Sequence, residues 1–222
     1  MSDLPILYSF RRCPYAMRAR MALAASGAEV MLREVLLKDK PAELLAASPK
    51  ATVPVLVLSE DQALEESLDV MQWALEHRDP LGWLDGAPLD SGWISECDGD
   101  FKHWLDRYKY AEGYPDHTAE DFRKNAEEFI QKLEHQLSVS DWVGGEAANA
   151  IDVALFPFIR QFAGVEPSWW QQAPYPKVRQ WLENWLNSAL FSAIMAKYPR
   201  WESGQPGERF PPSPDHGAPT HA

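Results

Sequence analysis

The chain has 222 residues, a mass of 25.2 kDa and a hydrophobic fraction of 45%, enough apolar material for one large domain or two smaller ones. Its formal net charge is -12 and its pI is about 4.9, so its field repels phosphates and anionic lipids, and we expect neither nucleic acid nor a membrane as partner. The sequence has no 20-residue apolar run, no basic secretion signal and only two cysteines, Cys13 and Cys97, which together predict a reducing cytoplasm.

Residues 1–78 alternate between strand and helix patterns. Short apolar runs predict strands at Leu4–Phe10, Glu29–Leu37, Val53–Leu58 and Gln62–Leu64. Helix formers and helical spacing predict helices at Pro14–Ala25, Lys40–Ser48 and Glu66–His77. The order β-α-β-α-β-β-α predicts a mixed sheet packed by helices.

The remainder of the chain has a different texture. Residues 79–92 are dense in Gly, Pro and Asp and are the predicted linker. In residues 93–202 the large apolar side chains recur at helical spacing, which predicts an all-helical domain. Residues 203–222 are rich in Pro and Gly, and we expect a flexible tail.

The stretch "FRRCPYAMRAR" (Phe10 to Arg20) contains the most informative residue, Cys13. It follows a predicted strand and precedes Pro14, a residue favoured at the first position of a helix. Backbone N–H groups and the helix dipole would stabilise a thiolate there, and four arginines (Arg11, Arg12, Arg18 and Arg20) could add positive potential. We therefore expect a reactive thiol; the alternative is a small, inert core residue.

A redox cycle between two neighbouring cysteines is excluded. Ala16 stands where a Cys-x-x-Cys motif would have its second cysteine. A single reactive thiol must form its mixed disulfide with an external partner, and a small abundant thiol is the simplest one.

Three short motifs follow one another in the first part of the chain: "CPYA" after the first strand, "TVPVL" (Thr52 to Leu56) and "EES" (Glu65 to Ser67). Their order and spacing resemble the cytosolic glutathione transferases, and the cysteine resembles the omega class and related bacterial branches. The resemblance implies a thioredoxin-like amino-terminal domain, an all-helical carboxy-terminal domain, glutathione as cosubstrate, and a homodimer.

The same resemblance implies the glutathione-binding residues. A cis Val53–Pro54 bond would leave the Val53 backbone to pair with the extended peptide, although an ordinary edge-strand proline is the alternative. Glu66 would accept from the ammonium group and Ser67 would bind the carboxylate of the γ-glutamyl end, unless they only cap a helix. Lys38, or Lys40 as an alternative, would contact the glycyl carboxylate.

The second substrate is expected between the two domains. Its walls would include Phe10, Tyr15, Trp104 and Tyr108, with Trp169-Trp170 on the far side.

The histidines have no metal-ligand spacing, so no metal is predicted. In the helical domain "NAID" fits a capping element of the family, with Asn149 as N-cap and Asp152 at the third helical position.

The predicted activity is that of a cysteine-type glutathione transferase. The Cys13 thiolate would attack a glutathionyl mixed disulfide or a glutathionyl substrate carbon, and a second glutathione would regenerate the thiol; dehydroascorbate is one candidate oxidant. Two alternatives stay open: conjugation with Tyr8 or Ser9 activating glutathione, and a non-enzymatic module that binds partner proteins.

Overall fold

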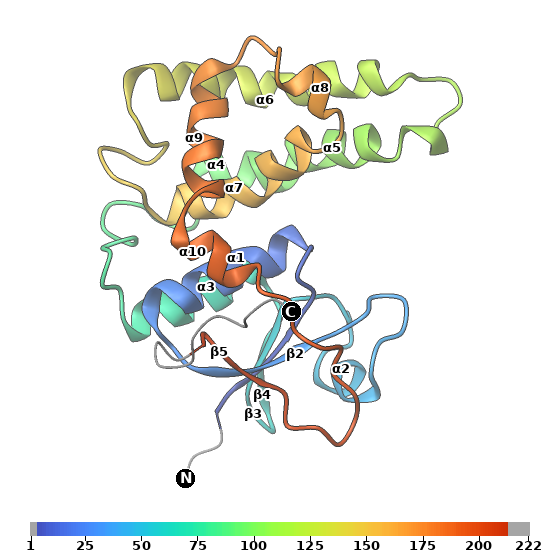
Figure 1. The fold of residues 1–222 in the computed structure, drawn as a ribbon, viewed down its shortest axis with the longest axis vertical. Coiled ribbons are helices and arrows are strands. Elements are labelled where there is room, and N and C mark those ends of the chain that lie inside the picture. Colours follow the sequence, from blue (N-terminus) through green and yellow to red (C-terminus); the bar gives the residue numbers. More distant parts are fainter. Residues whose placement is uncertain (1–3, 213–222) are drawn as a thin grey trace, which may run out of the picture. The chain divides into compact units, whose positions relative to one another are not determined.

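The computed structural model describes residues 4–212, and it divides them into two compact units. The first unit contains the residues up to Pro80 together with those from Ala189 onward, and the second spans Leu81–Ser188. The first unit combines a sheet with helices, and the second is helical (Figure 1). A unit with a mixed sheet and helices together with an all-helical unit is the architecture predicted from the sequence.

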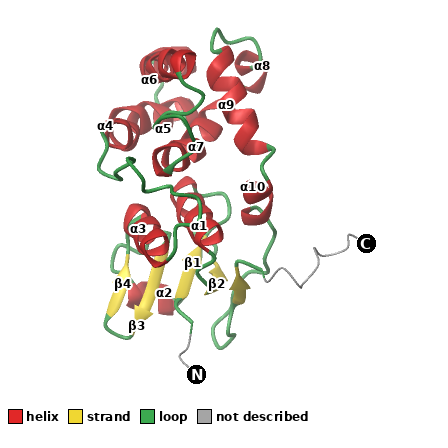
Figure 2. Cartoon of the chain, turned by 90° about the vertical axis from the view of Figure 1, so that its left-hand side faces the viewer, coloured by secondary structure: helices red, strands yellow, loops and turns green. Residues whose placement is uncertain are grey.

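The first unit is built on a five-stranded sheet in the order β4-β3-β1-β2-β5 (Figure 2). Its strands are β1 (Ile6–Ser9), β2 (Val30–Glu34), β3 (Val55–Ser59), β4 (Gln62–Leu64) and β5 (Glu208–Phe210). Only the β1–β2 pair is parallel, joined through a helix, while the β1–β3, β3–β4 and β2–β5 pairs are antiparallel. The mixed sheet predicted from the alternating pattern is confirmed.

Four helices complete this unit: α1 (Pro14–Ser26), α2 (Ala42–Ala47), α3 (Ser67–His77) and α10 (Ala189–Ile194). Helix α1 begins at Pro14, whose missing N–H costs nothing there, and ends at Gly27, which adopts the left-handed φ of 73°. Helix α1 packs against α3 and α10. These contacts hold α1, whose N-cap residue is Cys13, within the first unit.

The carboxy-terminal segment corrects two expectations. Helix α10 packs on α1 within the first unit, whereas the predicted helical domain extends to residue 202. The predicted flexible tail contains strand β5, whose Phe210 is fully buried. Gly207 makes this possible, because its φ is 99° and a Cβ there would lie 2.8 Å from the Leu32 carbonyl oxygen. Residues 213–222 of that tail lie outside the described residues.

The second unit contains a bundle of helices. They are α4 (Gly92–Glu96), α5 (Lys102–Lys109), α6 (Ala119–Val139), α7 (Ala150–Ala163), α8 (Pro167–Trp170) and α9 (Pro176–Leu186), with a π-helical turn at Cys97–Phe101 and a 3-10 turn at Ala111–Gly113. The large apolar side chains that recur at helical spacing lie on α4, the π-helical turn, α5, α6 and α9, and most of them are buried. Cys97 is one of them, and it is fully buried.

Helix α7 begins with the predicted cap. Asn149 accepts from the Ile151 N–H at 3.0 Å, and Asp152 accepts from the Asn149 N–H at 3.4 Å. Asp152 is fully buried and also accepts from the Val143 N–H at 2.9 Å and from the indole N–H of Trp181 at 2.8 Å. The cap therefore also ties α7 to the preceding loop and to α9.

Candidate functional site

Cys13 occupies the N-cap position of α1, as predicted. Its backbone is extended (φ -73°, ψ 125°), its side chain is half-buried, and no acidic residue lies in the first turn of the helix. The positive end of the helix dipole is therefore not offset by a nearby carboxylate of α1. The Cys13 thiol points to the Val53 carbonyl oxygen, with an Sγ–O distance of 3.5 Å.

Val53 and Pro54 form a turn directly before β3. The Val53–Pro54 peptide bond is cis, which confirms that expectation. Within residues 4–212 the Val53 N–H has no hydrogen-bond partner. The turn thus offers an unused backbone donor next to the Cys13 sulfur.

The "EES" motif lies at the amino end of α3. Ser67 is the first helical residue and is 5% exposed, while Glu66 is the N-cap and its side chain is 62% exposed. The Glu66 side chain makes no capping hydrogen bond to this helix, so the first N–H groups of α3 remain available to an anion. The alternative of a plain side-chain cap does not hold.

Lys50 is a residue that the sequence reasoning missed. Its ammonium group pairs with the Glu66 carboxylate, and this pairing raises the pKa of Lys50. Lys38, by contrast, lies exposed in the turn after β2 and has no ion pair among the described residues. The sequence signal that could have revealed Lys50 is its position four residues before the cis proline, Pro54.

The arginines near Cys13 have different roles. Arg18 and Arg20 are fully buried, and Arg20 pairs with Glu34 at 3.4 Å. Arg11 is half-buried, and its backbone N–H donates to Glu34. Arg12 is exposed, with its guanidinium 5.5 Å from the centre of the Phe10 ring. All four arginines were candidates to add positive potential at Cys13, but two of them, Arg18 and Arg20, lie in the interior.

Two hydroxyls were alternatives to the thiol. Tyr8 is 2% exposed, and its hydroxyl lies 2.6 Å from the Arg33 guanidinium. Burial raises the pKa of Tyr8, although Arg33 partly lowers it. Ser9 is fully buried, and its hydroxyl has no hydrogen-bond partner in the described part of the chain. Neither hydroxyl is accessible to a ligand in this conformation.

The four predicted pocket residues divide between the units. Phe10 and Tyr15 are half-buried in the first unit, where Phe10 and Cys13 both pack against a core cluster that includes Tyr8 and Val53. Trp104 is half-buried on α5 and stacks on Phe122 of α6, with ring centres 6.4 Å apart. Tyr108 is 1% exposed, so its ring belongs to the core of the second unit and lines no open pocket there.

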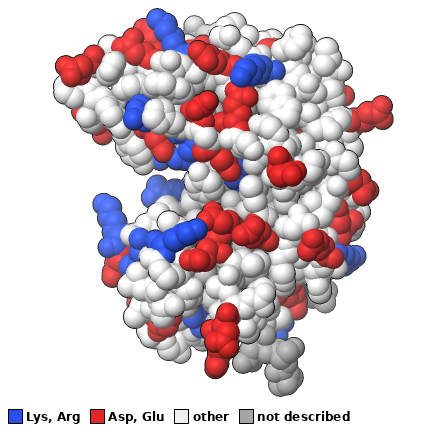
Figure 3. Space-filling model, turned by 180° about the vertical axis from the view of Figure 1, so that it is seen from behind, with Lys and Arg blue, Asp and Glu red and all other residues white. Residues whose placement is uncertain are grey.

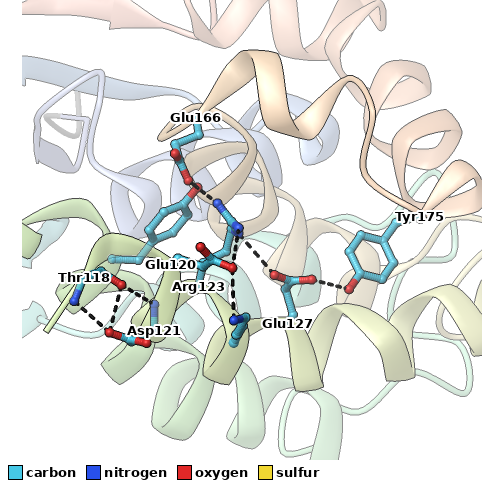
Figure 4. Close-up of polar contacts among 9 residues, drawn as sticks. Thr118, Glu120, Asp121, Arg123, Glu127, Glu166 and Tyr175 are labelled. Carbon is cyan, nitrogen blue, oxygen red and sulfur yellow. Dashed lines mark hydrogen bonds and ion pairs between the residues drawn. The ribbon is translucent and has the colours of Figure 1, made fainter.

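Tyr108 instead joins a polar network that the sequence did not indicate. Figure 4 labels Arg123, Glu127, Glu166 and Tyr175 of this network. The Tyr108 hydroxyl donates to Glu166 at 2.6 Å, and Arg123 lies between Glu166 (2.5 Å) and Glu127 (3.2 Å). Tyr175 donates to the other oxygen of Glu127 at 2.6 Å. Burial and the Glu127 carboxylate raise the pKa of Tyr175 to about 12. The network links α5, α6, the start of α8 and the loop before α9.

The described residues contain no cluster of three or more side chains suited to hold a metal ion. None of the helices between residues 4 and 212 is long and apolar enough to cross a membrane. On the face in Figure 3, acidic and basic side chains are interspersed.

Comparisons with known proteins give one consistent answer. The family model for the glutathione S-transferase N-terminal domain matches residues 7–83, and the model for the C-terminal domain of the same family matches residues 61–184. Glutathione S-transferase U28 of Arabidopsis thaliana is 29% identical over 188 residues, which cover 79% of this chain and 81% of that relative. Glutathione S-transferase omega-1 of Sus scrofa is 26% identical over 195 residues, covering 85% and 79%.

A solved structure supports the fold. The glutathione transferase family member from Pseudomonas fluorescens, with two glutathione molecules bound, superposes with a TM-score of 0.72 at 18% identity. The match covers 87% of this chain and 92% of that one.

Proposed function

Because the chain belongs to the glutathione S-transferase family, and is therefore an enzyme that uses glutathione as cosubstrate, we propose that Cys13 carries its chemistry as a thiol transferase. The observation that carries the proposal is the place of Cys13 at the N-cap of α1, before a first helical turn that contains no acidic residue. A helix amino terminus stabilises a thiolate, and the thiolate is the nucleophile.

The proposed reaction has two exchange steps. The Cys13 thiolate attacks the glutathionyl sulfur of a mixed disulfide; the S–S bond breaks, a Cys13–glutathione disulfide forms, and the second thiol leaves as a thiolate that takes a proton. A second glutathione thiolate then attacks the glutathionyl sulfur on Cys13. Oxidised glutathione leaves, and the Cys13 thiolate is restored.

Glutathione binding would use the groups around this thiol. The Val53 N–H would donate to the peptide, and the uncapped N–H groups of α3 with Ser67 would bind the γ-glutamyl carboxylate. Glu66 would accept from the γ-glutamyl ammonium, which must then compete with Lys50 for that carboxylate. Lys38 has the exposure needed to meet the glycyl carboxylate, and Lys40 is its alternative.

The conjugation alternative receives less support. It needs a hydroxyl of Tyr8 or Ser9 next to the bound glutathione sulfur, and both residues are at most 2% exposed. Tyr8 is also occupied by Arg33. No observation favours the non-enzymatic binding module. A cytoplasmic location and a homodimer stay predictions from the sequence and its family resemblance.

The test is intact-protein mass after incubation with oxidised glutathione, for the wild type, Cys13→Ala and the control Cys97→Ala. We expect a glutathione adduct in the wild type and in Cys97→Ala, none in Cys13→Ala, and loss of the adduct on adding reduced glutathione. An adduct that persists in Cys13→Ala, or unchanged thiol transfer in that variant, refutes the proposal.

A further inference from the structure

The short loop before α1 sets the position of Cys13. Residues Phe10 to Cys13 form a turn in which the Cys13 N–H donates to the Phe10 carbonyl at 2.9 Å. The N–H of Arg11, inside this turn, donates to the Glu34 carboxylate at 2.6 Å. Glu34 is the last residue of β2 and pairs with Ser9 of β1. The carboxylate therefore fixes the turn from the neighbouring strand.

Glu34 is itself held in place on several sides. Its second carboxylate oxygen lies 3.4 Å from Arg20, whose side chain is fully buried. Its backbone carbonyl accepts from the Trp201 N–H at 2.8 Å, so the carboxy-terminal segment fixes the residue as well. The Glu34 side chain is only 13% exposed. A charge at this depth is stable only with partners, and here the partners are Arg20 and the Arg11 N–H.

Among residues 4–212, Glu34 is the one carboxylate that pairs with Arg20. The Nε and Nη2 atoms of Arg20 are buried without hydrogen-bond partners in this range. Its guanidinium lies 5.6 Å from the Tyr198 ring centre and 5.4 Å from that of Phe210. Both rings come from the carboxy-terminal segment, so this segment encloses the Arg20–Glu34 pair.

We propose that Glu34 is a positioning residue for Cys13, acting as a fixed hydrogen-bond acceptor that holds the turn of residues 10–13 so that the thiol stays at the amino end of α1. Glu34 touches no substrate in this role; it acts through the Arg11 backbone. The inference rests on the proposed function of Cys13 for its catalytic meaning, but the position of the thiol can be measured without it.

The acceptor role separates two substitutions. In Glu34→Gln the amide oxygen can still accept from the Arg11 N–H, whereas Glu34→Ala removes the acceptor and releases the turn. Both leave Arg20 buried without its counter-charge, which costs stability. Each of the two substitutions is therefore also made in an Arg20→Met background. This third substitution removes the buried charge and keeps an apolar side chain of similar length.

The first readout is the rate of Cys13 alkylation by iodoacetamide, followed by peptide mass, alongside thermal unfolding of each variant. Because misplacing a reacting group by about 1 Å can cost up to 100-fold, we expect alkylation to slow about tenfold in Glu34→Ala, and to stay within about threefold of wild type in Glu34→Gln. Glu29→Ala, which removes an exposed partner of Arg209 near the same strand, is the control and should react at the wild-type rate.

The outcomes also distinguish a failure of the positioning role from a failure of the proposed thiol transfer. Equal rates for the Gln and Ala variants in the Arg20→Met background would overturn the positioning role. Slowed alkylation in Glu34→Ala with rescue by Gln supports it, even if Cys13 forms no glutathione adduct, an outcome that would overturn only the proposed thiol transfer.

Discussion

Asp152 offers a sharp test of how the second unit is held together. Replacing it with Ala removes a fully buried carboxylate that accepts from the Val143 N–H at 2.9 Å and the Trp181 indole at 2.8 Å. Both donors belong to residues that are at most 3% exposed, so water cannot replace the acceptor without opening the structure. Each buried donor left unsatisfied costs ~1–3 kcal/mol, and we expect a loss of about 4 kcal/mol in the free energy of unfolding.

The matched control is Asp121, which occupies the same third position in the capping box of α6 with Thr118 (Figure 4). This box is exposed, so Asp121→Ala should cost only about 1 kcal/mol. The assay is urea unfolding followed by tryptophan fluorescence. Similar losses for the two variants, or a loss below about 2 kcal/mol for Asp152→Ala, would refute the argument that burial sets the cost.

Three further predictions follow from single contacts. Since the pKa of Tyr175 is raised from 10.0 to about 12, its contribution to stability is full below pH 10 and is lost as the pH rises toward 12; Tyr175→Phe should flatten the pH dependence of thermal unfolding in that window, and an unchanged slope would contradict it. Phe210→Ala should lower the unfolding free energy by about 3–5 kcal/mol, measured by urea unfolding, whereas a loss under 1 kcal/mol would mean that β5 carries little of the packing. Glu66→Gln should weaken glutathione binding about tenfold in calorimetry, since a hydrogen bond to a charged group contributes ~1.5–3 kcal/mol; Lys50→Ala, which only frees Glu66, should not weaken it.

Much of the first unit could be predicted because its signals are local. Pro14 and Gly27 mark the two ends of α1, and the apolar runs mark the buried strands. Cys13 and Val53 lie 40 residues apart, and the sequence alone does not bring them together. The family resemblance implied only that both belong to the glutathione site. The cap at Asn149 was readable for the same local reason, since both partners lie within one helical turn.

The features that were missed depend on distant partners. Strand β5 has three residues and becomes a strand only because β2 offers an open edge. Arginine side chains on a helix are mostly exposed to solvent. Arg20 is buried instead, because the Tyr198 and Phe210 rings of the carboxy-terminal segment lie against its guanidinium. Tyr108 shares its helix with Trp104, and the helical period does not say which ring faces the core. Such outcomes follow from packing, which no short window of sequence contains.

Strand β5 has a consequence for how copies of the chain can meet. An uncovered strand at the end of a sheet presents free N–H and C=O groups that recruit strands from other molecules. Here β5 covers β2 at one end, and the other end is β4, which has only three residues. Removal of β5 would uncover the edge of β2 at Val30–Leu32, where a strand from another molecule could pair. The carboxy-terminal segment thus protects the protein against aggregation through its own sheet.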